Sequence, residues 1–365
     1  MTSVLSSDWQ GKCWPVLLPS ILPVPPCKEA ASNAAWNIQM GTVRRLTEAR
    51  LRTILQRQDP PSFGRDYDPS IRAVREEAPR LSRYAKVRSE VVGRYIHALS
   101  APEKWTLFIV LYCPRLFDIH EQRMLPYLPA PHPLAGHPLA AGIKLPDFRG
   151  TLAVAQELGA LDLHPVLHVP DKGNPGRFNA VPFPWIGDFL LFLQDAQGPY
   201  CVNLTIKSTE AEFDVPSVGT TSKTDMGRAI RREEIRHKVE KILYDDIGIP
   251  TIRVAADQLS PVLLANLEQI YGWQRRGHPF DEYQRLEIVE ALRSGLLAGT
   301  SALEIIHNLM VEFGYSIEHV KSVLYQSIWQ RELRIDLYQY FFIEKPMIPE
   351  RRDVLNEFSH CFRRA

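Results

Sequence analysis

The sequence has few cysteines, no long apolar run and almost no net charge, and each absence excludes a class of protein. Its five cysteines are scattered, odd in number and form no Cys-x-x-Cys pair, which argues against a disulfide framework and a structural zinc site. No apolar run reaches the roughly 18 residues that a membrane-spanning helix needs. The first residues lack the basic and apolar segments of a secretory signal peptide. We therefore expect a protein of the reducing cytosol with no membrane partner.

The net charge of +1 says little about binding partners, but the charges are unevenly distributed. Basic residues outnumber acidic ones over residues 44–94, and a second basic cluster extends over residues 223–241. Such a local excess can neutralise the phosphates of a nucleic acid. It can equally be a solvated helix face that also carries glutamates. Charge alone leaves both interpretations open.

The pattern of hydrophobic residues divides the 365-residue chain into three parts. Residues 1–41 are irregular and rich in proline. Residues 42–275 begin with a helix predicted at 42–58, and further helices then alternate with strands and one hairpin, which predicts an α/β fold with a mixed sheet flanked by helices. Residues 276–365 contain three helical patterns separated by glycine. With a strand or β-wing expected at 333–342, they predict a smaller, mostly helical, winged-helix-like domain.

The central feature is a hairpin, residues 185–207, in which two β-rich apolar runs flank a polar turn. If the turn is centred between the two runs, Asp188 lies opposite Thr205, and Lys207 lies one diagonal step away. Side chains alternate along a strand, so Thr205 and Lys207 share one face while Ile206 points into a core. A carboxylate and an ammonium group are therefore expected at one edge of the hairpin.

An acid at the start of one strand and a lysine at the end of the next form the pattern of a metal-dependent nuclease. Phosphodiester hydrolysis needs a divalent ion and an activated water, and Mg²⁺ prefers carboxylate oxygens and waters as ligands. Asp188 and Lys207 supply the acid and the lysine, whereas Thr205 offers a neutral hydroxyl where an acid or amide is usual. An Asp and a Lys at this separation are also a common accident, so the pair alone does not establish a nuclease.

Other polar residues have structural interpretations. Ser100 is a good N-cap for a helix that ends before Pro114, and Glu103 completes a capping box by accepting the Ser100 backbone N–H. Four histidines in the region between this helix and the hairpin are not at metal-ligand spacing. We interpret them as structural or surface residues: His132, His137, His164 and His168.

Several motifs on both sides of the hairpin occur in a definite order. L-S-A-P-E is followed by L-F-D-I-H-E-Q-R-M-L-P-Y-L-P and G-I-K-L-P-D-F-R-G, then by the hairpin strands D-F-L-L-F-L and N-L-T-I-K. H-K-V-E-K-I-L-Y-D-D-I-G-I-P and S-P-V-L-L-A-N-L-E-Q-I-Y come after it. Together they resemble the TnsA family, the endonuclease subunit of heteromeric cut-and-paste DNA transposons. The resemblance covers residues 42–275, and the helical tail is similar in position and pattern.

The resemblance implies a restriction-endonuclease-like fold for the region it covers, and it implies catalytic roles. Glu103 occupies the position of the first catalytic acid, a role compatible with capping. Asp188 matches the central metal-binding aspartate, and Lys207 matches the catalytic lysine. Glu240 aligns with an acidic position on the following helix and is a possible additional site residue. Alternatively, it is a charge on the helix surface.

The resemblance also implies a divalent cation, Mg²⁺, for which Mn²⁺ can substitute. Glu103 and Asp188 would hold it through their carboxylates. Thr205 stands where the family has a metal-side glutamine, and the backbone carbonyl of Ile206 would supply a ligand whatever its side chain. No other cofactor is implied.

The implied function is nicking of the 5′ ends of a transposon in the bacterial cytosol. The partners would be double-stranded DNA at the transposon ends, an RNase-H-like transposase subunit that cuts the 3′ ends, and an AAA+ ATPase regulator that docks on the C-terminal domain. Thr205 favours a different function, a catalytically silent assembly subunit that activates the transposase. The helical tail alone favours a winged-helix transcriptional regulator.

Overall fold

The computed structural model of the chain describes residues 46–79, 82–171, 176–213 and 223–364. The predicted N-terminal segment, residues 1–41, lies outside the described residues, as does the predicted start of the first helix at residue 42. The described helix begins only at Glu48, because Thr47 adopts an extended backbone and its Oγ1 accepts the Arg50 N–H at 3.2 Å.

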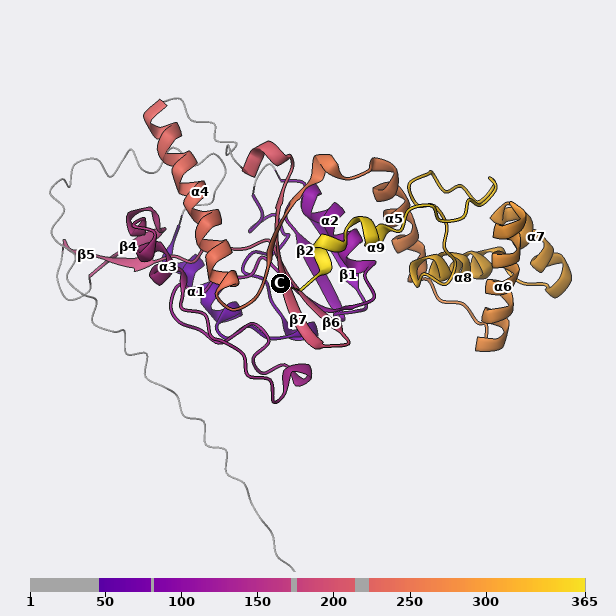
Figure 1. Ribbon diagram of the computed structural model, residues 1–365, viewed down its shortest axis with the longest axis horizontal. Helices are drawn as coiled ribbons and strands as arrows, with labels where there is room; N and C mark the ends of the chain where they lie inside the picture. Colours follow the sequence, from indigo (N-terminus) through magenta and orange to yellow (C-terminus); the bar gives the residue numbers. More distant parts are fainter. Residues whose placement is uncertain (1–45, 80–81, 172–175, 214–222, 365) are drawn as a thin grey trace, which may run out of the picture. The chain divides into compact units, whose positions relative to one another are not determined.

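The described helices and strands follow the predicted order (Figure 1). The strands are β1 (Ala85–Ser89), β2 (Arg94–Ala98), β3 (Leu116–Glu121), β4 (Val166–Pro170), β5 (Phe178–Pro182), β6 (Phe189–Asp195), β7 (Gly198–Lys207) and β8 (Thr251–Ala255). The α-helices are α1 (Glu48–Gln58), α2 (Ala101–Leu111), α3 (Thr151–Glu157), α4 (Lys223–Asp245), α5 (Pro261–Gln274), α6 (Glu282–Ala298), α7 (Ala302–Phe313), α8 (Ile317–Trp329) and α9 (Val354–Glu357). Short 3₁₀ helices are η2 (Gly64–Asp66), η3 (Pro138–Ala140), η4 (Leu161–Leu163), η5 (Glu210–Phe213), η6 (Ala256–Gln258) and η7 (Ser359–Phe362). None of these helices is both long and apolar enough to cross a membrane.

The central sheet is mixed, as the sequence predicts. Its strand order is β3-β6-β7-β8. The pairs β3·β6 and β6·β7 are antiparallel, whereas β7·β8 is parallel. The pairs β1·β2 and β4·β5 form separate two-stranded sheets.

Alternation along β6 and β7 sends their apolar side chains into two helical layers. On one face, Leu191 and Leu204 pack among buried residues of α2 and α5. On the opposite face, Leu190 and Cys201 pack among buried residues of α3 and α4. The sheet is therefore flanked by helices on both faces. Residues of either helical layer can contact side chains at the ends of the strands.

Helices α6, α7 and α8 form the predicted helical tail. The side chains of Asp281 and Ser301 accept hydrogen bonds from the first turns of α6 and α7. Gly299 and Gly314 adopt the left-handed conformation that ends these two helices. One cluster of buried residues extends from the sheet through α5 into the tail, and the clustering of contacts groups residues 40–365 together. The boundary between the two expected domains stays a prediction.

The strand or β-wing expected at residues 333–342 is wrong, because the described segment forms turns. Apart from an isolated bridge between Ile335 and Pro349, its backbone is bound by a side chain of α5 and not by a neighbouring strand. Asn266 Nδ2 donates to the carbonyls of Leu337 (2.9 Å) and Gln339 (2.7 Å), and its Oδ1 accepts the Phe341 N–H (3.1 Å). One buried amide thus replaces a ladder of strand hydrogen bonds.

Replacing Asn266 with alanine removes hydrogen-bond partners from three backbone groups of this segment. A buried polar group without a partner costs about 1–3 kcal/mol, so we expect Asn266→Ala to lower the free energy of unfolding by roughly 3 kcal/mol. Urea denaturation measures this loss. Asn356→Ala, at an exposed position on α9, is the control and should change the free energy little. Equal stability of Asn266→Ala and wild type would contradict the role of this side chain.

Candidate active site

The hairpin formed by β6 and β7 has the predicted register. Phe189 pairs with Leu204, and the turn lies at residues 196–197. Asp188, one residue before β6, is therefore opposite Thr205. Because side chains alternate along the two strands, the side chains of both residues lie on the sheet face that α3 and α4 cover.

The backbone of Ile206 faces the Asp188 carboxylate. Its N–H donates to Asp188 Oδ2 at 2.7 Å. The N–H and C=O of a strand residue point to the same side, so the Ile206 carbonyl also points toward Asp188. Thr205 Oγ1 is buried and makes no hydrogen bond. A buried hydroxyl without a partner is uncommon, and this oxygen is available to a ligand.

Glu103 reaches the same end of the sheet from the first turn of α2. Ser100 is the N-cap as predicted, and its Oγ accepts the Glu103 N–H at 3.2 Å. The predicted partner of the carboxylate is wrong: Glu103 Oε2 accepts the Leu99 N–H at 2.8 Å, and Oε1 accepts the Ser100 hydroxyl at 2.8 Å. Gln122 Nε2 donates to Oε2 at 2.9 Å. Every one of these neighbours is a donor, which favours the ionised carboxylate.

The charges of Glu103 and Asp188 act on each other directly. Burial of Glu103, and then the negative charge of Asp188, raise its pKa to about 8. The carboxyl is 7% exposed, so water screens this repulsion poorly. Two such carboxyls on facing elements are a common way to build an acidic catalytic or cation-binding site.

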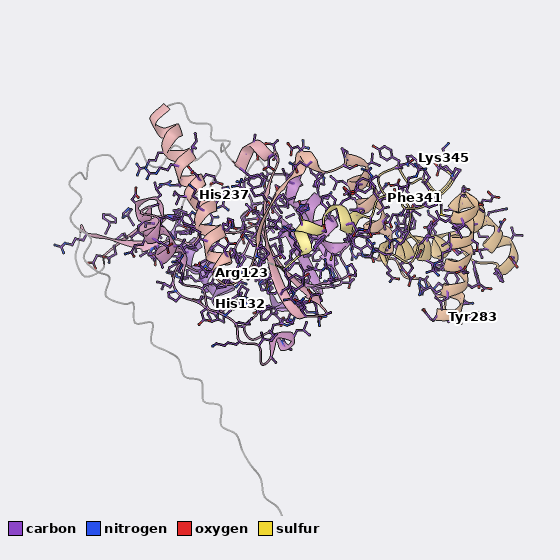
Figure 2. All side chains as sticks on the ribbon, viewed as in Figure 1. Arg123, His132, His237, Tyr283, Phe341 and Lys345 are labelled. Carbon is purple, nitrogen blue, oxygen red and sulfur yellow. The ribbon has the colours of Figure 1, made fainter. Side chains whose placement is uncertain are left out.

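Lys207 is at the end of β7, on the face that it shares with Thr205. Its Nζ donates to Glu233 Oε1 on α4 at 2.9 Å. The same oxygen is 3.0 Å from Arg236 Nη1 and 3.2 Å from Nε2 of His237, which Figure 2 labels on α4. Burial raises the pKa of Glu233, but the interactions with His237, Arg236 and Lys207 lower it well below its usual range. One carboxylate thus anchors three basic side chains.

Glu233 was not predicted as a site residue. In the sequence it stands in R-R-E-E-I-R-H, which also reads as a solvated helix face. The spacing of three to Arg236 and four to His237 indicates contacts along α4. Only the tertiary structure brings the helix against Lys207.

Glu240 is buried on α4 at 1% exposure, so its interpretation as a helix-surface charge is wrong. Its Oε1 accepts Asn203 Nδ2 at 3.1 Å, and its Oε2 makes no hydrogen bond. A Cβ added to Gly187 would lie 3.2 Å from Oε1, so a larger residue immediately before Asp188 would press against this carboxylate. Burial raises the pKa of Glu240; Arg236 opposes this shift and Asp188 adds to it.

These groups fit a hard divalent cation in their chemistry. Carboxylate, carbonyl and hydroxyl oxygens from Glu103, Asp188, Ile206 and Thr205 converge on one end of the sheet. In the described parts of the chain, no three Asp, Glu, His or Cys side chains form a cluster that could hold an ion alone. Mg²⁺ is usually held by one or two protein carboxylates, with waters and substrate phosphates completing its shell, so this donor set suits it.

The two basic clusters differ in their surroundings. In the first, Arg57 is 2.7 Å from Glu77, and Arg94 binds Glu121 through two hydrogen bonds of 2.7 and 2.8 Å inside the fold. In the second, Arg231 is exposed on α4. The first cluster is thus partly structural, whereas the second leaves basic side chains facing solvent.

The predicted histidines have no common site. His132 and His164 are buried, and Figure 2 marks His132 near Arg123.

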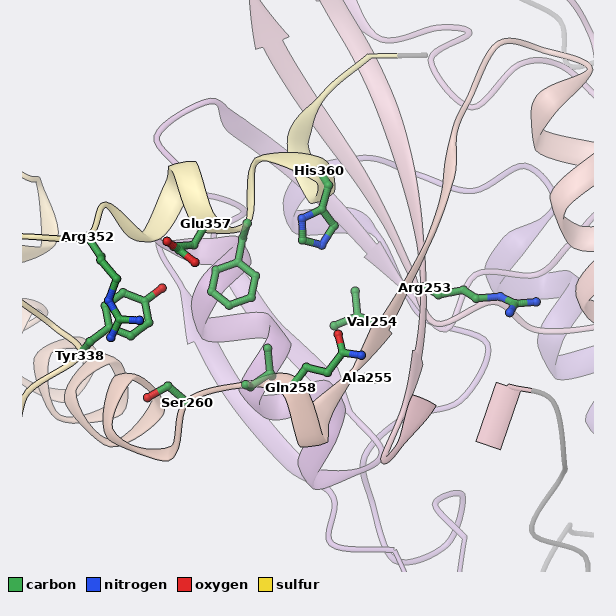
Figure 3. A pocket seen from close by; sticks show the side chains of 11 residues that line it. Arg253, Val254, Ala255, Gln258, Ser260, Tyr338, Arg352, Glu357 and His360 are labelled. Atoms are coloured by element: carbon green, nitrogen blue, oxygen red, sulfur yellow. The ribbon is translucent and has the colours of Figure 1, made fainter. Parts of the chain in front are cut away.

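A cavity of about 440 Å³ lies between β8, the start of α5 and the C-terminal segment (Figure 3). Arg253 points away from the other labelled side chains there. No predicted site residue lines this cavity, so the candidate active site is the group of side chains at the sheet end.

Comparison of the sequence with models of known protein families found no match. Comparison with curated proteins found none either. The functional interpretation therefore rests on the geometry described above and on the resemblance of the sequence motifs to the TnsA family.

Burial of Glu103, and then its repulsion by Asp188, should make the protein less stable as pH rises. Because the folded pKa of Glu103 is about 8, above that of an unfolded glutamate, the destabilisation grows between about pH 5 and pH 8.5. Glu103→Gln removes this charge and should raise the free energy of unfolding by on the order of 3 kcal/mol at about pH 8.5, with little effect at about pH 5. Thermal unfolding in the presence of a chelator measures the stability of wild type and variant at both pH values.

Glu48→Gln, at an exposed position on α1, is the control for the loss of one negative charge. It should change stability little at either pH. A stabilisation by Glu103→Gln that is the same at both pH values would show that the pKa of Glu103 is not raised in the folded protein.

Proposed function

We propose that the chain is a metal-dependent DNA endonuclease, the subunit of a heteromeric transposase that nicks the 5′ ends of a transposon. The observation that carries this proposal is the convergence of Glu103 and Asp188 at the start of β6, where the charge of Asp188 helps to raise the pKa of Glu103. Lys207 follows on the adjacent strand. Two acids and a lysine in this arrangement suit phosphodiester hydrolysis.

The cation would be held by the carboxylates of Glu103 and Asp188 and by the Ile206 carbonyl, with the Thr205 hydroxyl as a further neutral oxygen. When bound, Mg²⁺ or Mn²⁺ would polarise a phosphoryl oxygen and activate a water molecule. The donor set includes no nitrogen or sulfur atom, as expected for Mg²⁺. The partnerless Thr205 Oγ1 supports a ligand at this position.

Lys207 would act through its ammonium protons. It can donate a hydrogen bond to the attacking water and to a non-bridging phosphate oxygen, and its positive charge offsets charge that develops during hydrolysis. Glu233, 2.9 Å from Nζ, limits the positions that the flexible lysine side chain can take. A fixed donor loses less entropy when it engages the substrate.

The assignment to 5′ transposon ends rests on the resemblance to TnsA. The proposal includes a restriction-endonuclease-like fold for residues 42–275 and a winged-helix-like tail. The described tail, however, has no strand at the expected wing. Transposon-end DNA, an RNase-H-like transposase subunit and an AAA+ ATPase would be the partners. Exposed Arg231 on α4 supports a DNA backbone contact.

A catalytically silent assembly subunit is the second candidate. Thr205 in place of a glutamine favours it, as does the ion pair that Lys207 makes with Glu233. In this alternative, the repelling carboxylates would persist without a chemical role. Their cost in stability argues for the nuclease, because strained or repulsive groups are typically retained where function needs them.

Assembly of the chain with its transposase partner on transposon-end DNA in Mg²⁺ tests the proposal. We expect wild type to break the 5′ strand at each end. Asp188→Ala should reduce 5′ nicking by on the order of 100-fold or more, because a lost cation ligand costs several kcal/mol of transition-state stabilisation. Joining of the 3′ ends by the partner should persist. Mapping of strand breaks on end-labelled DNA measures both reactions.

Asp195→Ala is the matched control, since Asp195 ends the same strand at the far side of the hairpin and pairs with Arg364 at 2.8 Å. It should leave the 5′ breaks intact. If wild type makes no 5′ break with either Mg²⁺ or Mn²⁺ while 3′ joining proceeds, the silent assembly subunit is the correct function.

A further inference from the structure

Gln122, the residue after β3, has an unusual backbone conformation. Its φ angle is +49°, in the left-handed region that residues other than glycine seldom occupy. Among the described residues, Arg331 is the one other non-glycine residue with positive φ. Gln122 is also buried, at 4% exposure. A strained and buried residue persists only where its surroundings fix it, and such residues concentrate at functional sites.

Hydrogen bonds on both sides hold Gln122 in this conformation. Its N–H donates to the Asp188 carbonyl at 2.8 Å, and its own carbonyl accepts the Ser70 N–H at 3.1 Å. The preceding residue, Glu121, is fixed by Arg94 through hydrogen bonds of 2.7 and 2.8 Å. The backbone at Gln122 is therefore tied directly to the backbone of a predicted cation ligand.

This conformation directs the amide of Gln122 at the other predicted ligand. Its Nε2 donates to Glu103 Oε2 at 2.9 Å. The same oxygen accepts the Leu99 N–H, and Oε1 accepts the Ser100 hydroxyl. The three donors fix the orientation of the Glu103 carboxylate: Oε2 accepts two of them and Oε1 accepts one, which leaves a lone pair on Oε1 for a further partner.

We propose that Gln122 is a positioning residue that presents the Glu103 carboxylate to a divalent cation shared with Asp188. This inference rests on the proposed function. Residues behind metal ligands orient them and raise affinity, and their loss typically lowers metal affinity about 10- to 100-fold. Gln122 is suited to this role because it links Glu103 through its side chain with Asp188 through its backbone. It adds no negative charge to an already acidic site.

The side-chain length of Gln122 offers a clean test. Asparagine keeps the amide group and tolerates positive φ better than most residues, but it is one methylene shorter and cannot reach Glu103 from the same backbone. Gln122→Asn thus preserves the fold while removing one hydrogen bond. Gln58 is the matched control: it is buried at 3% exposure, and its amide donates to the carbonyl of Asp68 and accepts the N–H of Met124.

The experiment measures Mn²⁺ binding to the full chain by loss of the free Mn²⁺ signal in electron paramagnetic resonance, together with the thermal unfolding midpoint in a chelator. We expect Gln122→Asn to weaken Mn²⁺ binding about 10- to 100-fold with a similar unfolding midpoint. Gln58→Asn should lower the midpoint and leave Mn²⁺ affinity as in wild type. Titrating cleavage of end DNA with Mg²⁺ should show that Gln122→Asn needs more Mg²⁺ and recovers at high concentration.

The outcomes separate this inference from the proposed function. Wild-type affinity for Mn²⁺ in Gln122→Asn would overturn the positioning role even if the protein nicks DNA. Equal losses of Mn²⁺ affinity in Gln122→Asn and Gln58→Asn would show that Gln122 has only a general packing role, and would also overturn the positioning role. Weakened binding in Gln122→Asn alone would support it, even if wild type makes no 5′ breaks and the nuclease function fails. Absence of Mn²⁺ binding in wild type would overturn both.

Discussion

The candidate site depends on the repulsion between the buried carboxyl of Glu103 and the half-buried carboxylate of Asp188. They come from opposite sides of the sheet: Asp188 precedes a central strand, and Glu103 is at the start of a helix on the other face. Burial and mutual repulsion raise the pKa of Glu103 to about 8. The fold tolerates this cost because hydrogen-bond donors surround Glu103, and the N-terminus of α2 also favours negative charge.

Helix α4 provides the positive charge that the site needs on its other side. Burial lowers the pKa of Arg236, but the carboxylates of Glu233, Glu240 and Asp188 raise it above its usual value. Its guanidinium also donates to the Ile186 carbonyl at 2.9 Å, just before Asp188. The helix therefore balances charge, holds Lys207 through Glu233, and supports the chain leading to Asp188. A cation between Glu103 and Asp188 would complete this balance.

The sequence predicts the elements of the site better than their surroundings. The position of the turn predicted the register that places Asp188 opposite Thr205, and a shift of one residue would expose an entire apolar face. The helix at Glu103 follows from Ser100 and Pro102. By contrast, the contact of Glu233 with Lys207 depends on how α4 packs, which local spacing does not contain. The positive φ of Gln122 likewise follows from tertiary hydrogen bonds, since no glycine marks the position. The strand predicted at residues 333–342 is absent because the side chain of Asn266 binds the backbone of this segment, and the local sequence pattern does not contain that contact.

The central claim is that Glu103 and Asp188 form one cation site, and a crystal structure of the chain soaked in Mn²⁺ tests it most directly. Anomalous diffraction reveals the position of the manganese independently of the protein atoms. A peak bridging the Glu103 and Asp188 carboxylates, within about 2.0–2.4 Å of their oxygens and of the Ile206 carbonyl, is the predicted result. If saturating Mn²⁺ gives no peak between these carboxylates, or a peak that only other residues coordinate, the two acids do not form a cation site.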